Sequence, residues 1–369
     1  MAGAHLRCAL SSTNRLRLSR GGSNIDPEPT IQHFGPNRHP IVLDDMPSPI
    51  SHIPLRLLIF PMVLALVFQP SACHRADVRS SLAANSLVAH SSNPTMLAVY
   101  LPWFGSAGHI NVGYSSQDRV VIAKQIEEAK RLGIAGFVVN WYGAQHEFED
   151  KAYALMQQVA AEKNFQVALM YDENDSDPAN ATDLVLLDLQ YAYDHYAGPD
   201  ATVAPTAYLH YQGRPVIFIF PKGGHADWNR VHQTVTSWKN PPLLIFKDVS
   251  KEYSNAFDGF YAWVNPGARG WQADGGNWGE QYLESFYKTM ASDYPSKIAM
   301  GAAWPGFDDS KASWSQNRKM NSRCGRTFED TVNLFRSYDH QHPMPFLMVE
   351  TWNDYEEGTA IEKGLHPCK

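Results

Sequence analysis

Two carboxyls near the C-terminal end of the chain, Asp354 and Glu357, have the residue types and the spacing of a catalytic pair. Cleavage of a glycosidic bond ordinarily needs one carboxyl that protonates the leaving oxygen and a second that activates water or attacks the sugar carbon. Three residues of extended chain span at most about 10 Å. That reach permits the roughly 6.5–9.5 Å separation of inverting enzymes and the roughly 5–5.5 Å of retaining ones, so the spacing does not indicate the stereochemical outcome.

The same spacing also occurs in helix caps. Asp-x-x-Glu resembles a capping box, with Asp354 as the N-cap and Glu357 at the third helical position. Gly358 and Thr359 continue a helix poorly, which argues against a cap, but spacing alone leaves both interpretations open. Asp172-Glu173 is equally ambiguous, because these carboxylates could bind a ligand or form the turn that precedes Pro178.

Tryptophan lies near the C-terminal end of five of the eight apolar segments that the sequence predicts as strands. Sugar sites combine aromatic faces for the rings with amides and carboxylates for the hydroxyls. A single tryptophan is more often a core residue, and only the repetition favours a carbohydrate site. The residues expected to bind substrate are Tyr100, Trp103, Asn140, Trp141, Tyr142, Asp172, Glu173, Lys222, Trp263, Trp304, Glu350, Trp352 and Tyr355.

Short apolar segments alternate with helical patterns over residues 96–362. Nearly continuous apolar runs of this length are typical of strands buried on both faces of a parallel sheet. The predicted strands are 96–104, 134–143, 165–173, 214–222, 241–248, 257–266, 296–307 and 344–354. The predicted helices are 118–132, 182–197, 227–238, 278–292 and 327–341, with Asp118 and Thr327 as the expected N-caps of the first and the last.

Eight strands separated by helices predict an α/β fold of the (β/α)8 TIM barrel type, which typically takes about 250 residues. A doubly wound open sheet is the alternative, but residues 103–106 after the first strand do not form its glycine-rich phosphate loop. No helical pattern follows the last strand, so we expect the eighth helix to be missing or truncated. Cys324 and Cys368 are either a disulfide that pins this end of the chain or two unrelated thiols.

The composition excludes several classes of protein. The 369 residues include 31 Lys and Arg against 38 Asp and Glu, a net charge of −7, which argues against a nucleic-acid-binding protein. Four cysteines are too few for a disulfide-dense scaffold or a multi-cysteine zinc module. The sequence contains no glycine-rich nucleotide motif, no nucleophile elbow and no close metal spacing of histidines. We therefore expect neither a cofactor nor a metal.

The N-terminal part of the chain differs from the rest. Residues 1–45 are polar and aperiodic, and we expect them to be a mis-called extension that precedes the true start at Met46. The apolar run at 57–68 is too short to span a bilayer and fits the core of a signal peptide or lipoprotein signal over 46–73.

Ser71-Ala72-Cys73 resembles the end of a lipoprotein cleavage box, with Cys73 as the lipidated residue, although Pro70 stands where leucine is usual. Ordinary signal cleavage or a short anchor remains the alternative. Residues 74–95 predict a flexible linker ahead of a catalytic domain over 96–369. The expected location is periplasmic, extracellular or lipid-anchored at the cell envelope, with the N-terminus as a membrane tether in the last case.

Four segments together resemble glycoside hydrolase families 99 and 71 and their unclassified bacterial relatives. They are YLPWF (100–104), QIEEAKRLGI (125–134), FVVNWYG (137–143) and WNDYEEGTAIE (352–362). The resemblance covers about residues 96–362 and implies a (β/α)8 enzyme acting on α-linked mannans or α-1,3-glucans. The catalytic pair of both families falls on Asp354 and Glu357. Asp354 departs from the glutamate of family 99, and Glu356 replaces its histidine, so the resemblance does not assign the substrate.

We interpret the chain as an exported, monomeric glycoside hydrolase that cleaves α-linked glycans, with a polysaccharide or oligosaccharide as its partner. Glu357 is the expected general acid, in an apolar pocket that raises its pKa, and Asp354 is the expected base or the activator of a substrate hydroxyl. Two alternatives stay open. One is a non-catalytic carbohydrate-binding barrel, and the other is a protein associated with polysaccharide biosynthesis.

Overall fold

A computed structural model describes residues 94–173, 177–222, 224–267 and 271–365. Within these ranges eight parallel strands form a closed barrel in the order β3-β2-β1-β11-β8-β7-β6-β5, and pairing of β3 with β5 closes it. The predicted (β/α)8 fold is therefore confirmed. The barrel strands are β1 (Thr95–Tyr100), β2 (Gly136–Trp141), β3 (Gln166–Asp172), β5 (Arg214–Phe220), β6 (Leu243–Lys247), β7 (Gly259–Tyr261), β8 (Ile298–Ala303) and β11 (Phe346–Val349).

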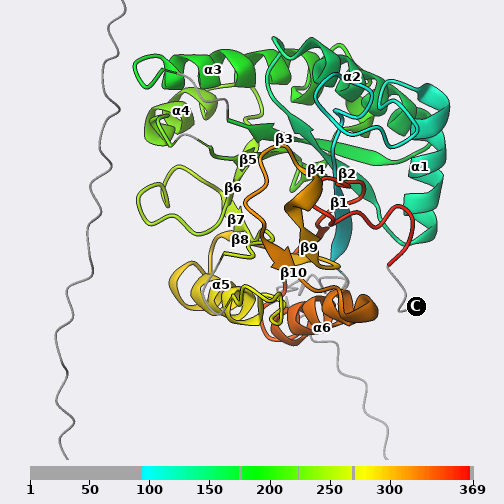
Figure 1. Ribbon diagram of the computed structural model, residues 1–369. Coiled ribbons are helices and arrows are strands. Elements are labelled where there is room, and N and C mark those ends of the chain that lie inside the picture. The colour runs from blue at the N-terminus through cyan, green and yellow to red at the C-terminus, as the bar shows by residue number, and fades with distance from the viewer. Residues whose placement is uncertain (1–93, 174–176, 223, 268–270, 366–369) are drawn as a thin grey trace, which may run out of the picture. The chain divides into compact units, whose positions relative to one another are not determined.

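In the same described residues, six α-helices surround these strands on the outside (Figure 1). They are α1 (Arg119–Arg131), α2 (Glu147–Glu162), α3 (Ala181–Ala192), α4 (Trp228–Val235), α5 (Glu280–Asp293) and α6 (Arg326–Asp339). The five predicted helices are confirmed, and α2 is an addition. In the part of the chain that the structure describes, no helix lies between β6 and β7 or after β11.

Short strands and single-turn helices lie in the loops. A two-residue strand, β4 (His210–Tyr211), adds antiparallel to β5, and β9 (Phe307–Asp308) pairs with β10 (Lys319–Met320) beyond β8. The single-turn helices are η1 (Tyr193–Ala197), η2 (Pro205–Ala207), η3 (Asp309–Lys311) and η4 (Arg323–Gly325). The β9–β10 hairpin and η3 belong to the long connection from β8 to α6, at the end of the barrel where the strands terminate.

Side chains alternate along each strand between the inside of the barrel and the layer under the helices. The hydrophobic cluster inside the barrel, called the inner cluster, includes Val99, Val138, Met170, Phe218 and Met348. The residues before and after each of them belong to the outer cluster, which lies between the strands and the helices. The period of two therefore fixes which residues at the strand ends can enter the barrel mouth.

Helix α1 illustrates how the sequence forms the outer layer. The carboxylate of Asp118 accepts the N–H of Val120, as predicted for its N-cap. Ile122, Ile126 and Ala129 lie on one buried face.

Helix α6 packs so closely against β8 that a Cβ added to Gly301 of this strand would lie 2.1 Å from Cδ2 of Phe335. Glycine is required there.

The expected cap of α6 is wrong. Thr327 lies inside the first turn, and the N-cap position is taken by Gly325, whose φ of 91° favours glycine. The Thr327 hydroxyl instead donates to the carbonyl of Asn321. Cys324, just ahead of the helix, is disulfide-bonded, while Cys368 lies outside the described residues.

The predictions for residues 1–45, for the signal segment 46–73 with Cys73, and for most of the linker 74–95 also concern residues outside the described ranges. Among the helices that the structure describes, none has the length and apolar character needed to cross a lipid bilayer.

Candidate active site

A cavity of about 670 Å³ opens at the C-terminal ends of the barrel strands. Each of the eight strands or the segment that follows it contributes to the wall, which is the usual place for chemistry in this fold. Of the residues expected from the sequence, the cavity is lined by Trp103, Asn140, Tyr142, Asp172, Lys222, Trp263, Asp354 and Glu357. Apolar rings and ionisable groups thus meet in one hollow.

Asp354 forms the tight turn that carries the second carboxyl. Its Oδ1 accepts the backbone N–H groups of Glu356 at 3.0 Å and Glu357 at 2.8 Å. Its own N–H donates to the Thr351 hydroxyl at 2.7 Å. These bonds are those of a cap, yet no helix follows within the described residues, and the turn brings both carboxyls to the cavity wall. The two interpretations of the Asp-x-x-Glu spacing therefore describe the same local geometry.

Both carboxyls resist ionisation. Burial and the charge of Glu357 raise the pKa of Asp354 to about 8, against the two N–H bonds that favour its charged form. Burial also raises the pKa of Glu357, while a hydrogen bond from Trp314 and the charge of Arg318 oppose the rise. The charge of Glu357 thus affects the ionisation of Asp354, so the two carboxyls titrate as a pair.

The surroundings of Glu357 come largely from the connection between β8 and α6. The indole Nε1 of Trp314 donates to Glu357 Oε1 at 3.1 Å, and Arg318 Nη2 lies 3.9 Å from the same oxygen. Lys247, the last residue of β6, contributes a further positive charge. Its Nζ lies 3.8 Å from the ring centroid of Phe220. Aromatic and cationic groups thus flank the carboxyl.

Glu356 lies between the two acids and turns away from the cavity. Its buried carboxylate is 2.8 Å from His109 Nδ1 and accepts the N–H of Ile110 at 3.0 Å. The His109 ring stacks on Trp103 with centroids 4.7 Å apart and an interplanar angle of 7°. Trp314 meets both rings edge-on. Glu356 thereby fixes an aromatic wall beside Glu357.

A second polar group lines the cavity at the ends of β2, β3 and β5. Lys222 Nζ lies 2.9 Å from Asp172 Oδ1, and Asn140 Nδ2 is 3.5 Å from the other carboxylate oxygen. Burial raises the pKa of Asp172 to about 6, and the ammonium of Lys222 limits the rise. Lys222 also lies 5.0 Å from the ring centroid of Tyr142. Lys222 is thus an ion-pair partner of Asp172, and the group offers hydrogen-bond donors and acceptors to a molecule in the cavity.

Several residues expected at the site do not line this cavity. The side chains of Tyr100, Trp141, Trp304 and Trp352 belong to the outer cluster under the helices. The hydroxyl of Tyr100 donates to Gln125, and the indole of Trp141 to Asp150. Since neighbours on a strand alternate, Trp141 and Tyr142 cannot both face the barrel mouth.

The remaining expected residues are buried or lie beside the mouth. Glu350 follows the inner face of β11, where its carboxylate accepts the N–H of Val264 and burial raises its pKa. Glu173 accepts the N–H of Lys222 at 3.3 Å. The hydroxyl of Tyr355 donates to Glu362. These residues support the cavity wall from behind and do not form it.

The sequence-based reasoning missed a set of wall residues. They are His109, His146, Glu149, Lys247, Asp248, Trp314 and Arg318. Lys247 lies in the predicted strand 241–248, two residues after Ile245 and four after Leu243, which both face the inside of the barrel. The alternation of side chains was therefore a usable signal. Trp314 and Arg318 reach the site through a long connection for which the sequence has no periodic signal.

In the residues that the structure describes, no cluster of three His, Cys, Asp or Glu side chains is arranged as a metal site. The carboxyl pair, the aromatic wall and the Asp172–Lys222 group are thus the chemistry that the cavity presents. Together they can exchange protons with a bound molecule, stack on a ring and hydrogen-bond to hydroxyls.

Comparison with known proteins extends the description. No protein-family model matches the sequence, and no curated protein matches it. The barrel resembles that of glycoside hydrolase family 99. Two structures of a family 99 endo-alpha-mannosidase from Bacteroides thetaiotaomicron, one in complex with bis-tris-propane, match with a TM-score of 0.56. Their sequence identities are 18% and 17%, over 72% of this chain and 86% and 87% of theirs.

A structure described as a glycoside hydrolase-like protein matches with a TM-score of 0.54 and 14% identity, over 75% of this chain and 91% of its own. At these identities the likeness shows the fold. The resemblance to family 99 expected from the sequence is confirmed at that level.

Proposed function

We propose that the chain is a glycoside hydrolase that cleaves an α-linked glycan of the α-mannan or α-1,3-glucan type, acting within the chain of sugars. The observation that carries the proposal is the pair of buried carboxyls, Asp354 and Glu357, which share one turn at the mouth of a barrel lined by aromatic rings. The family 99 resemblance supports an α-linked substrate, and the name of the neighbouring endo-alpha-mannosidase supports endo action.

In the proposed reaction Glu357 gives its proton to the glycosidic oxygen as the bond from that oxygen to the sugar carbon breaks. Asp354 takes a proton from the attacking water or from a neighbouring sugar hydroxyl. The two N–H bonds at Asp354 stabilise its carboxylate, which suits a base. Part of the pKa rise at Asp354 comes from the charge of Glu357, and this part disappears when Glu357 is protonated.

The test is release of products from α-1,3-glucan, α-mannan, α-1,4/1,6-glucan and β-glucan by the wild type, Glu357→Gln and Asp354→Asn. We expect cleavage of an α-glycan and a loss of at least about 10²-fold in either variant, the minimum for a general acid or base. Glu329→Gln, on the exposed side of α6, is the matched control. An aryl glycoside with a good leaving group identifies the acid, because Glu357→Gln should retain more activity on it than on the glycan.

A non-catalytic carbohydrate-binding barrel is the second candidate. The observation that favours it is the pair of cap bonds at Asp354, which is sufficient to explain an aspartate at this position without catalysis. This candidate is supported if no glycan in the panel is cut while the folded protein binds one of them, and if Asp354→Asn leaves that affinity unchanged.

A further inference from the structure

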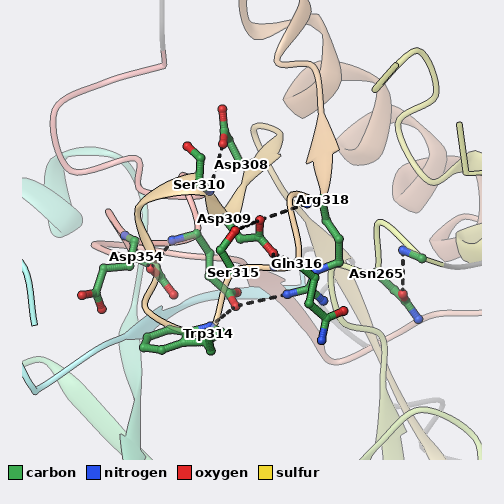
Figure 2. Close-up of polar contacts among 12 residues, drawn as sticks. Asn265, Asp308, Asp309, Ser310, Trp314, Ser315, Gln316, Arg318 and Asp354 are labelled. Carbon is green, nitrogen blue, oxygen red and sulfur yellow. Dashed lines mark hydrogen bonds and ion pairs between the residues drawn. The ribbon is translucent and has the colours of Figure 1, made fainter. Parts of the chain in front are cut away.

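The connection between β9 and β10 is organised around one buried carboxylate, that of Asp309. Its Oδ1 accepts the Ser315 hydroxyl at 2.9 Å and the N–H of Arg318 at 3.0 Å. Its Oδ2 accepts the N–H of Gln316 at 3.0 Å and the guanidinium Nε of Arg318 at 2.8 Å. Figure 2 shows these groups converging on Asp309. The bonds hold the pKa of Asp309 below its usual range, although the side chain is fully buried.

The same loop delivers two groups to Glu357. The Trp314 indole N–H is bonded to its Oε1, and the Arg318 guanidinium faces that oxygen. Trp314 is 40% exposed, so the hydrophobic core does not hold it in place. Its position depends on edge contacts with Trp103 and His109, with centroids 6.0 and 6.2 Å away, and on the fold of its own loop.

We infer that Asp309 is a positioning residue for Glu357, acting through the loop that it ties together and through Trp314 and Arg318. The inference rests on the proposed function, because it gives this loop a task in the acid step. When Glu357 transfers its proton to the glycosidic oxygen, a carboxylate remains. The indole N–H and the guanidinium then stabilise that carboxylate, and Asp309 keeps both where the charge develops.

Four charged side chains act on the carboxyl of Glu357. Asp354 and Asp309 contribute negative charge, while Arg318 and Lys247 contribute positive charge. Within the described residues, Trp314 is the side chain whose N–H bonds to the Glu357 carboxylate. Loss of the loop geometry would therefore weaken the N–H bond and the Arg318 contact together, leaving Lys247 as the cation that opposes burial and the charge of Asp354.

The first test does not need activity. The protein is prepared with ¹⁵N-labelled tryptophan, and the indole N–H signal of Trp314 is assigned by its absence in Trp314→Phe. We expect this signal to shift with pH as Glu357 titrates and to lose that shift in Glu357→Gln. In Asp309→Asn the pH-dependent shift should fall by at least half. Asp330→Asn breaks a 2.8 Å ion pair with Arg323 away from the cavity and should leave the signal unchanged.

Ser315→Ala removes one of the four bonds to Asp309 and should give a smaller change in the same direction, even if Asp309→Asn does not fold. An unchanged Trp314 titration in a folded Asp309→Asn protein, or in Ser315→Ala where Asp309→Asn does not fold, overturns the inference.

The second test uses the glycan identified as substrate. We expect kcat of Asp309→Asn to fall about tenfold or more, with KM changed less than about threefold, because the residue does not touch substrate. In Ser315→Ala, which keeps the charge of Asp309, the alkaline limb of the pH profile should move to higher pH, because a loosened Trp314 N–H and Arg318 guanidinium no longer favour the ionised form of Glu357. A rise in KM alone contradicts the inference. If no glycan is cut, the proposed function fails, while the tryptophan signal still decides whether Asp309 positions Glu357.

Discussion

Replacing Asp354 by asparagine should make the protein more stable as well as inactive. The pKa of this buried carboxyl is raised from 3.8 to about 8 in the folded protein. Between those values the pair formed by Asp354 and Glu357 holds a proton in the folded state that the unfolded state has lost. Stability is therefore complete below the unfolded pKa and falls as pH rises towards the folded one. The side chain introduced by Asp354→Asn keeps an acceptor oxygen for the two turn N–H groups and carries no titratable proton.

The size of the effect follows from the number of protons. One proton held only by the folded state lowers the free energy of unfolding by about 1.4 kcal/mol for each pH unit crossed. From pH 5 to pH 7 a single group thus accounts for at most about 3 kcal/mol. Asp172 and Glu357 have pKa shifts in the same direction, so part of the wild-type slope should remain after Asp354 is replaced.

The assay is denaturant unfolding of the wild type and Asp354→Asn at pH 4, 5, 6 and 7. We expect the two free energies of unfolding to agree near pH 4 and to diverge with increasing pH in favour of the variant. Glu329→Gln, on the exposed side of α6, should track the wild type. The reasoning is refuted if Asp354→Asn shows the wild-type pH slope. A constant loss of stability at every pH would instead show that the carboxylate serves mainly as a cap.

Three further predictions concern the core, the cavity wall and the N-terminus. Trp352→Phe, in the core, should lower the melting temperature and leave KM unchanged. Trp263→Ala, in the cavity wall, should raise KM roughly fivefold in steady-state kinetics, because about 1 kcal/mol of stacking on the substrate is lost. Gly301→Ala should cost about 1–3 kcal/mol in denaturant unfolding, because its Cβ would meet Phe335, and should leave kcat unchanged. The full chain expressed in a bacterial host with labelled fatty acid should carry the label, and Cys73→Ser should carry none; an unlabelled wild type would indicate ordinary signal cleavage.

The strands of the barrel were predictable because burial on both faces leaves a continuous apolar run in the sequence. Helix α2 lacks a clear start, since its N-cap His146 makes no side-chain cap bond, and the sequence-based reasoning did not assign it. Apolar content alone also does not say which face of a strand a residue occupies. For this reason the sequence analysis placed both Trp141 and Tyr142 at the site. In the structure Trp141 packs in the outer cluster under the helices, whereas Tyr142 lines the cavity.

The parts of the site that the sequence did not predict depend on contacts between distant segments. Trp314 reaches Glu357 from 43 residues away along the chain, and His109 reaches Glu356 from 247 residues away. No local spacing encodes such a contact, because it arises only when the closed barrel brings the ends of β1, β8 and β11 together. Residues that follow the alternation of a strand, such as Lys247, are the ones that a closer application of period two could have found.

The turn at the end of β11 shows why capping and catalysis were difficult to separate. The two N–H groups that Asp354 accepts close the turn, and the same bonds stabilise its carboxylate as a base. Gly358, with φ of 67°, continues the turn where an added Cβ would lie 3.1 Å from the Asp308 carbonyl oxygen. The backbone is thereby held against β9, and the N–H of Asp308 donates to the Glu357 carbonyl at 2.8 Å. A spacing that suits a cap thus places two acids on one wall, where the β8 connection supplies the donors to the second.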